Sequence, residues 1–284
     1  MDGGPQGGRT GGLGGKRLRV EIVLAAADTL GVVASDEALP FSSPDPSAPA
    51  PTVPRVSDAV LAGRSAPPSF DWHALVEPTL WEQVPEDVDD LLRLLPRADL
   101  YVQDELNLDL HPTLTRTWSR RGRRGQRRVR APGQNRKLVG FGAIDWRTGW
   151  LSHGIGWRRD SAAICLQLAH LVERSQQRGR IVLLLWDNLG IHTRRGSKRL
   201  RAWLDEHADQ IRLIYTPSYD PDANPAERLW RAMRPNVTHN HHHDNLAGLY
   251  ADARTYFDGL DAAPEQVLAH IGSSFALNHQ AAAA

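Results

Sequence analysis

The stretch "TPSYDPDANPAERLW", residues 216–230, places two aspartates, an asparagine and three prolines around a single glutamate. Asn224 is a favoured helix N-cap residue, and Pro225 suits the first helical position. Glu227 then stands three residues after the cap, where a capping box has its glutamate. Spacing alone therefore leaves two interpretations of Glu227: a residue that caps a helix, or a functional carboxylate that the turn holds in place.

Two aspartates follow predicted strands elsewhere in the chain. The run "IVLLLWDN" (181–188) begins as an unbroken apolar segment, which is typical of a strand buried on both faces, and Asp187 follows it. The stretch "DLYVQDE" (99–105) predicts a short strand with Asp104 near its end. Strand ends in an open sheet converge on one edge, so we expect these aspartates to meet there.

Three carboxylates around one point would form a hard, oxygen-rich site that suits Mg²⁺ or Mn²⁺. Such ions can activate a hydroxyl group and stabilise a leaving oxygen in phosphodiester chemistry. Simpler interpretations remain open at this stage. Asp187 and Asn188 could form a turn after a strand, and Asp104 could be a solvated strand end.

The segments around these acids alternate between strand and helix patterns. Residues 137–157 predict a hairpin that turns at Thr148 and Gly149. Further patterns predict helices over 161–179, 197–208, 225–234, 244–258 and 264–271, and a strand over 211–217. The order is three meandering strands followed by alternating β and α segments. It predicts an α/β fold with a mixed sheet of about five strands, three antiparallel and then parallel, flanked by helices.

The front of the chain has a different composition. Residues 1–15 hold eight of the 24 glycines, and residues 40–68 hold eight of the 19 prolines. Such a composition buries too little apolar surface to offset the entropy of ordering. We therefore predict a low-complexity, mostly disordered segment over 1–65, within which a short helix at 19–32 fits the pattern. A helical segment over 66–95 leads into a domain over 96–275, and 276–284 form a tail.

The totals exclude several classes of protein. The net charge is +1 and Cys165 is the only cysteine, so no internal disulfide can form. Cys165 falls inside a predicted helix and is expected in the core, not as a nucleophile. No apolar run reaches the ~18–20 residues of a membrane span, and no phosphate loop of the ATP-binding pattern occurs. We expect a cytoplasmic protein with no membrane partner.

Basic charge is concentrated in "RTWSRRGRRGQRRVRAPGQNRK" (116–137), which has ten Lys and Arg residues and no acid. Arginine binds phosphate in a bidentate manner, and Trp118 could stack on a base, so the segment predicts contact with a nucleic-acid backbone. A solvated basic hairpin is the alternative. The predicted DNA-binding residues are Arg120, Arg121, Arg123, Arg124, Arg127 and Arg128.

A histidine run occupies 239–243, with Asn240 inside it. Its spacing fits no closed Cys/His zinc site, so we interpret it as a polar lead-in to the next helix.

Five segments in order carry a resemblance to a known family. They are "YVQDE" (101–105), "TWSRRG" (117–122), "LLWDNLGIH" (184–192), "YTPSYDPDANPAERLW" (215–230) and "THNHHHDNLAGL" (238–249). Residues 97–249 resemble the catalytic domain of mariner-like insertion-sequence transposases, which are DDE endonucleases of the RNase H-like fold. The fourth segment is the most specific. Ala226 departs from the pattern, because a bulkier aliphatic residue is common there.

The resemblance implies a function. Asp104, Asp187 and Glu227 would be the catalytic, metal-binding triad, with Asn188, His192, Asn224 and Pro225 in supporting positions. The protein would use Mg²⁺ or Mn²⁺ to cleave DNA at element ends and join the 3′-hydroxyl to target DNA. It would act as a homodimer on DNA and associate with the nucleoid. An inactive DNA-binding remnant and an RNase H-like nuclease are the alternatives.

Transposases of this kind normally carry helix-turn-helix modules ahead of the catalytic domain. Residues 1–65 offer at most one short helix, so the resemblance finds no match there. We therefore expect a truncated or frame-split product that binds DNA with little sequence preference. A separately encoded helix-turn-helix partner would supply the recognition of element ends.

Overall fold

The computed structural model describes residues 13–31, 70–122, 128–158, 160–187, 197–218 and 220–273. Its strands are β1 (Ala98–Asp109), β2 (Lys137–Asp145), β3 (Leu151–Gly156), β4 (Ile181–Trp186) and β5 (Ile211–Tyr215). Its α-helices are α1 (Leu13–Gly31), α3 (Val88–Leu94), α4 (Ser161–Gln177), α5 (Lys198–Glu206), α6 (Ala226–Val237), α7 (Leu246–Asp261) and α8 (Pro264–Ile271). Short 3₁₀ segments are η1 (Trp72–Ala74), η2 (Pro78–Gln83), η3 (Leu95–Arg97) and η6 (Pro221–Ala223).

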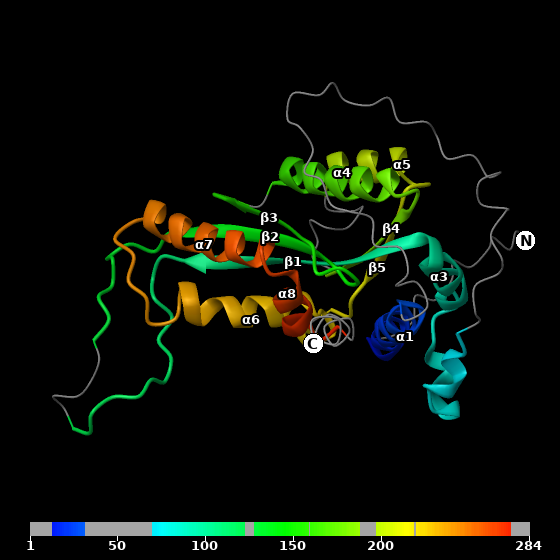
Figure 1. Ribbon diagram of the computed structural model, residues 1–284, viewed down its shortest axis with the longest axis horizontal. Helices are drawn as coiled ribbons and strands as arrows, with labels where there is room; N and C mark the ends of the chain where they lie inside the picture. The colour runs from blue at the N-terminus through cyan, green and yellow to red at the C-terminus, as the bar shows by residue number, and fades with distance from the viewer. Residues whose placement is uncertain are drawn as a thin grey trace, which may run out of the picture.

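The five strands form one mixed sheet in the order β3-β2-β1-β4-β5 (Figure 1). The pairs β1–β2 and β2–β3 are antiparallel, whereas β1–β4 and β4–β5 are parallel. The hairpin turns where expected, and Gly149 takes a φ of +71° there, in the left-handed region that glycine tolerates best. The predicted α/β fold, with a mixed five-stranded sheet flanked by helices, is confirmed.

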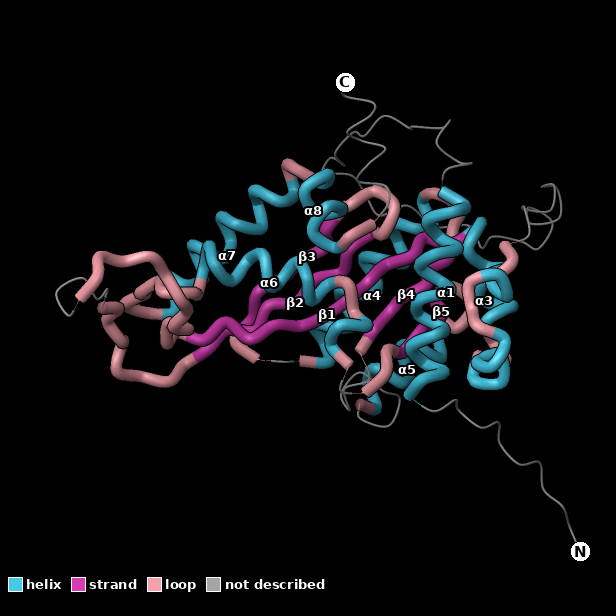
Figure 2. Tube along the Cα trace, turned by 90° about the horizontal axis from the view of Figure 1, so that it is seen from below, coloured by secondary structure: helices cyan, strands magenta, loops and turns pink. Residues whose placement is uncertain are grey.

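Helices cover both faces of the sheet, and each face has its own core. α4 and α5 lie on one face, where Leu168 and Leu200 pack with Trp186 and other strand residues. α6, α7 and α8 lie on the opposite face, as Figures 1 and 2 show, and contribute Trp230 and Phe257 to the larger core. Side chains alternate between faces along each strand, so the sequence of β1 sends every second residue towards α6.

The front of the described chain is more ordered than the sequence predicted. The helix expected at 19–32 begins at Leu13, and its residues Val20, Val23 and Ala26 are buried in the larger core. Asp28 accepts a hydrogen bond from the Trp146 indole at 2.7 Å. The helix expected within 1–65 therefore forms and is longer than expected, because its apolar residues have a place to pack. The rest of 1–65 lies outside the described residues.

The segment over 66–95 contains the expected helical structure as η1, η2 and α3, although 66–69 lie outside the described residues. The predicted domain over 96–275 is described as far as residue 273, and the tail over 276–284 also lies outside. Among the described helices, none is long and apolar enough to cross a membrane.

Candidate active site

Asp104 lies on β1, on the face of the sheet that α6 covers. Only 5% of its surface is exposed. The indole Nε1 of Trp230, on α6, donates a hydrogen bond to Asp104 Oδ2 at 3.0 Å. Its neighbour Gln103 points to the other face and donates to Gln167 of α4. The backbone alternation of β1 and the indole of α6 together fix the direction of the Asp104 carboxylate.

Asp104 does not lie at a strand end, which corrects the sequence prediction. β1 continues to Asp109 because it keeps its antiparallel pairing with β2, up to the pair Asp109↔Lys137. Its parallel pairing with β4 stops earlier, at Val102↔Leu185. The edge of β1 is therefore released from β4 just before Asp104. The acids can still lie at one edge, because β4 ends there even though β1 continues.

Asp187 follows Trp186, the last residue of β4, and is half-buried. The β1–β4 register pairs Val102 with Leu185, so extending it by two residues sets Asp187 level with Asp104. The same alternation that sends Leu183 and Leu185 into the larger core assigns Asp187 to the side of Asp104.

Glu227 is half-buried in the first turn of α6, and the turn before it is tied to β1. The buried Asn224 donates from Nδ2 to the Gln103 carbonyl at 2.9 Å and accepts at Oδ1 from the Ala226 N–H at 3.2 Å. Pro225 follows in helical geometry as the predicted helix start. Asn224 therefore anchors the start of α6 beside the residue that precedes Asp104.

Glu227 does not complete a capping box, because the N–H that it would bind has another acceptor. A capping-box glutamate accepts from the backbone N–H of the cap residue. The Asn224 N–H instead donates to the Pro221 carbonyl at 3.1 Å. The Asn224 side chain caps the helix, and Glu227 lies close enough for its charge to act on Asp104.

The electrostatics of Asp104 reflect the closeness of the other two acids. Burial is the largest cause that raises the pKa of Asp104, and the negative charge of Glu227 is the next; together they bring it to about 8. Asp187 raises the pKa of Asp104 further, against hydrogen bonds from the Glu105 backbone and Trp230. The carboxylates at the end of β4 and at the start of α6 thus both act on the carboxylate of β1.

Trp230 and Gly142 are functional neighbours that sequence reasoning missed. Gly142 pairs with Asp104 across β1–β2, and a Cβ there would come within 2.6 Å of the Trp230 ring. The missing side chain gives the indole room to lie across β2 and reach Asp104. The glycine inside a strand pattern was the available signal, because it indicates close approach of another group.

The arginine-rich segment, residues 116–137, follows the C-terminal end of β1 and leads into β2. Arg120, Arg121 and Arg128 are exposed, and Trp118 is fully exposed. Arg123, Arg124 and Arg127 lie outside the described residues, as do Asn188 and His192.

The histidine run lies against the base of the arginine-rich segment. Thr113 pairs with His239 in a short parallel bridge. The side-chain amide of Asn240 accepts a hydrogen bond from the Thr115 N–H and donates one to Thr115 Oγ1. His242 Nδ1 lies 2.9 Å from the Arg130 carbonyl. His243 instead pairs with Asp252 of α7 at 3.0 Å. The run thus joins the arginine-rich segment to α7, and the side chains of Asn240, His242 and His243 each have a protein partner.

Cys165 is buried on α4 in the smaller core, and burial raises the pKa of its thiol. Its predicted place in the core is confirmed.

The chain is similar in sequence to one curated protein. The chain is 32% identical over 165 residues to the insertion element IS630 uncharacterized 39 kDa protein of Shigella sonnei, which covers 58% of this chain and 46% of that protein. The chain therefore spans about half the length of this curated relative.

Two solved structures show a partial likeness. The Mos1 transposase paired-end complex with left transposon end has a TM-score of 0.48 at 18% identity, over 65% of this chain and 54% of that chain. A pre-cleavage Mos1 transpososome has a TM-score of 0.47 at 14% identity, over 90% of this chain and 94% of that chain.

One protein family matches the sequence over more than half of its length. The profile of the DDE superfamily endonucleases matches residues 99–249, which is more than half of the chain and contains all three acids of the site. This chain belongs to the DDE superfamily endonucleases.

Proposed function

We propose that the chain supplies the catalytic domain of a DNA transposase, with Asp104, Asp187 and Glu227 as its catalytic triad. The observation that carries the proposal is the convergence of three acids where β4 ends and α6 begins. Burial and like charge raise the pKa of Asp104, as expected where acids are assembled to share a cation. The reaction would be cleavage of DNA at element ends, followed by transfer of the freed 3′-hydroxyl into target DNA.

The donor set of this site fits Mg²⁺ or Mn²⁺. Carboxylate oxygens are the ligands these ions prefer, and two of the acids are only half-buried, which leaves access for water and a phosphodiester. A bound ion would supply activation of the attacking oxygen and stabilisation of the leaving oxygen. The role of the chain is to hold the carboxylates in position: Trp230 fixes Asp104, and Asn224 fixes the helix that bears Glu227.

A cleavage assay with three substrates tests this function. Full-length protein should nick duplex DNA that carries the element end when Mg²⁺ is present, and EDTA should stop the reaction. An RNA–DNA hybrid of the same sequence should be left intact. Preferential cutting of the hybrid would assign the site to an RNase H-like nuclease. No metal-dependent cleavage of any substrate by folded protein would assign the chain to an inactive remnant.

We further propose that the exposed arginines bind the DNA backbone. Replacing Arg120, Arg121 and Arg128 with Ala should weaken binding to all DNA sequences alike. It should also flatten the dependence of log affinity on log salt by roughly one unit for each lost phosphate contact. Gel shifts across a salt series measure the slope. A control variant of two exposed arginines that precede β1, Arg93→Ala with Arg97→Ala, should keep the wild-type slope. An unchanged slope in the arginine variant would leave the segment as a solvated surface.

The same proposal extends to partners. We infer a homodimer on DNA, association with the nucleoid, and a separately encoded helix-turn-helix partner that recognises element ends. A competition gel shift of element-end against random DNA tests the last point. Specific binding usually exceeds non-specific binding by roughly 10³-fold or more. A preference of that size by this chain alone would place a recognition module within it.

A further inference from the structure

A second group of metal-ligating side chains lies outside the triad, between the edge strand β3 and helix α7. His153 is in the middle of β3 and pairs with Gly142 of β2. Its ring stacks on Phe257 of α7, with centroids 4.8 Å apart and planes inclined by 18°. Only 13% of the His153 side chain is exposed. The imidazole is therefore held in a fixed orientation at the rim of the sheet.

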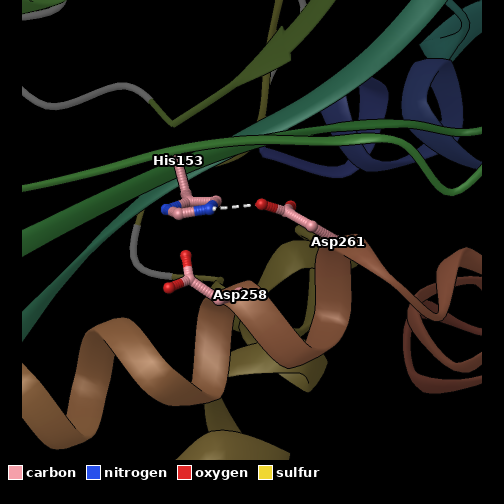
Figure 3. A group of neighbouring side chains, drawn as sticks. All are labelled: His153, Asp258 and Asp261. Carbon is pink, nitrogen blue, oxygen red and sulfur yellow. Dashed lines mark hydrogen bonds and ion pairs between the residues drawn. The ribbon is translucent and has the colours of Figure 1, made fainter. Parts of the chain in front are cut away.

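Two carboxylates from the last turn of α7 face this ring, as Figure 3 shows. Asp261 Oδ2 lies 3.0 Å from His153 Nε2. Asp258 lies one turn earlier on the same helix face. One ligand atom from each of His153, Asp258 and Asp261 lies within 4.8 Å of the other two. Tetrahedral ligands at about 2.0–2.2 Å from one ion lie roughly 3.4 Å from one another, so the three side chains would need to draw together by about 1 Å to hold a cation.

The position of the two acids at the end of the helix is an independent reason to expect a cation there. The carboxyl end of a helix carries partial negative charge and favours cations. α7 has no basic residue in its last turn and ends instead with these two aspartates. Arg254 Nε donates to Asp258 Oδ1 at 2.9 Å and offsets part of this charge. The helix end, Asp258 and Asp261 together still concentrate negative charge next to the His153 imidazole.

We propose that His153, Asp258 and Asp261 bind a divalent transition metal, with Zn²⁺ or Mn²⁺ as the matching ions. One imidazole nitrogen and two carboxylate oxygens form a mixed set that suits these ions better than Mg²⁺, which prefers oxygen alone. The triad, in contrast, offers oxygen alone. The ion would join β3 to the end of α7 over Phe257, whose ring also contacts Trp230. Its role is to fasten the helix layer that supports the Asp104 partner.

Zinc binding to the full chain tests the site without relying on catalysis. Every protein in this experiment carries Asp104→Asn and Glu227→Gln, which remove ligands of the triad. Every titration is done in millimolar Mg²⁺. Isothermal titration with Zn²⁺ should detect one site whose affinity falls at least about tenfold with His153→Gln and with Asp261→Asn. His241→Gln, in the exposed histidine run, is the matched control and should change nothing. Zn²⁺ should also raise Tm in the background protein and not in the His153→Gln protein.

Three outcomes would overturn the site. Zinc affinity that is unchanged in both His153→Gln and Asp261→Asn would assign the pair to an ordinary ion pair. A loss confined to His241→Gln would place the zinc in the histidine run. Binding weaker than about 1 mM would rule out a functional site. Asp261 is 46% exposed and its replacement leaves the core intact, so this variant keeps the test valid if His153→Gln fails to fold.

Discussion

Asp187→Asn should abolish DNA cleavage while the protein folds as before. Asp187 is half-buried after β4, and asparagine keeps its shape while removing its charge. A metal-binding carboxylate contributes several kcal/mol to the transition state, so cleavage should fall by roughly 10³-fold or more. Nicking of element-end DNA in Mg²⁺, measured as a single-turnover rate, gives the effect. Asp104→Asn and Glu227→Gln should have effects of the same order.

The matched control for this experiment is Asp209→Asn, which changes an exposed acid in the turn between α5 and β5. It should cleave at the wild-type rate. A folded Asp187→Asn protein that also cleaves at that rate would refute the triad, because the loss of charge would then have no consequence.

Asp104→Asn should also make the metal-free protein more stable at neutral and alkaline pH. The folded-state pKa of Asp104 is raised from 3.8 to about 8, chiefly by burial and then by Glu227. Below the unfolded pKa both states are protonated, and this group does not oppose folding. As the pH rises towards the folded pKa, the unfolded state ionises first, and the free energy of unfolding falls. Asparagine cannot ionise and still accepts the hydrogen bond of Trp230.

Thermal melts in EDTA between pH 4 and pH 9 measure this effect. The variant should exceed wild type by on the order of 2 kcal/mol at pH 8, or about 4–8 °C in Tm, and the gap should close near pH 4. Mg²⁺ should raise the wild-type Tm and narrow the gap. A variant that melts below wild type at pH 8 would mean that the Asp104 carboxylate is already compensated within the protein. If the variant is more stable than wild type, the stability that Asp104 costs is the expected consequence of gathering acids for function.

The sequence predicted the end of β4 better than it predicted the end of β1. Asp187 was placed correctly because an apolar run followed by an acid marks the end of a buried strand. Asp104 was assigned to a strand end because "DLYVQDE" stops being apolar there, but β1 continues to Asp109 through pairing with β2. Pairing between distant segments is a tertiary property, and local sequence does not encode its length.

Other features needed packing partners that the sequence does not reveal. α1 follows a glycine-rich stretch, and its place in the core depends on contacts with α3 and Trp146. The hydrogen bond from Trp230 to Asp104 joins residues 126 positions apart. Conversely, Asn224 was recognised from its neighbours alone, because a cap is local chemistry.

The unequal pairing of β1 leaves a stretch of β-ribbon between the three acids and the arginine-rich segment. Beyond Val102 the strand continues only as a ribbon with β2 and β3, and the arginine-rich segment starts after its tip. Five residues separate Asp104 from Asp109, and at about 3.3 Å each they span roughly 17 Å. A duplex rises about 3.4 Å per base pair, so under the proposed function DNA that runs along this ribbon would extend about five base pairs from Asp104 before it passes the tip and reaches the arginine-rich segment.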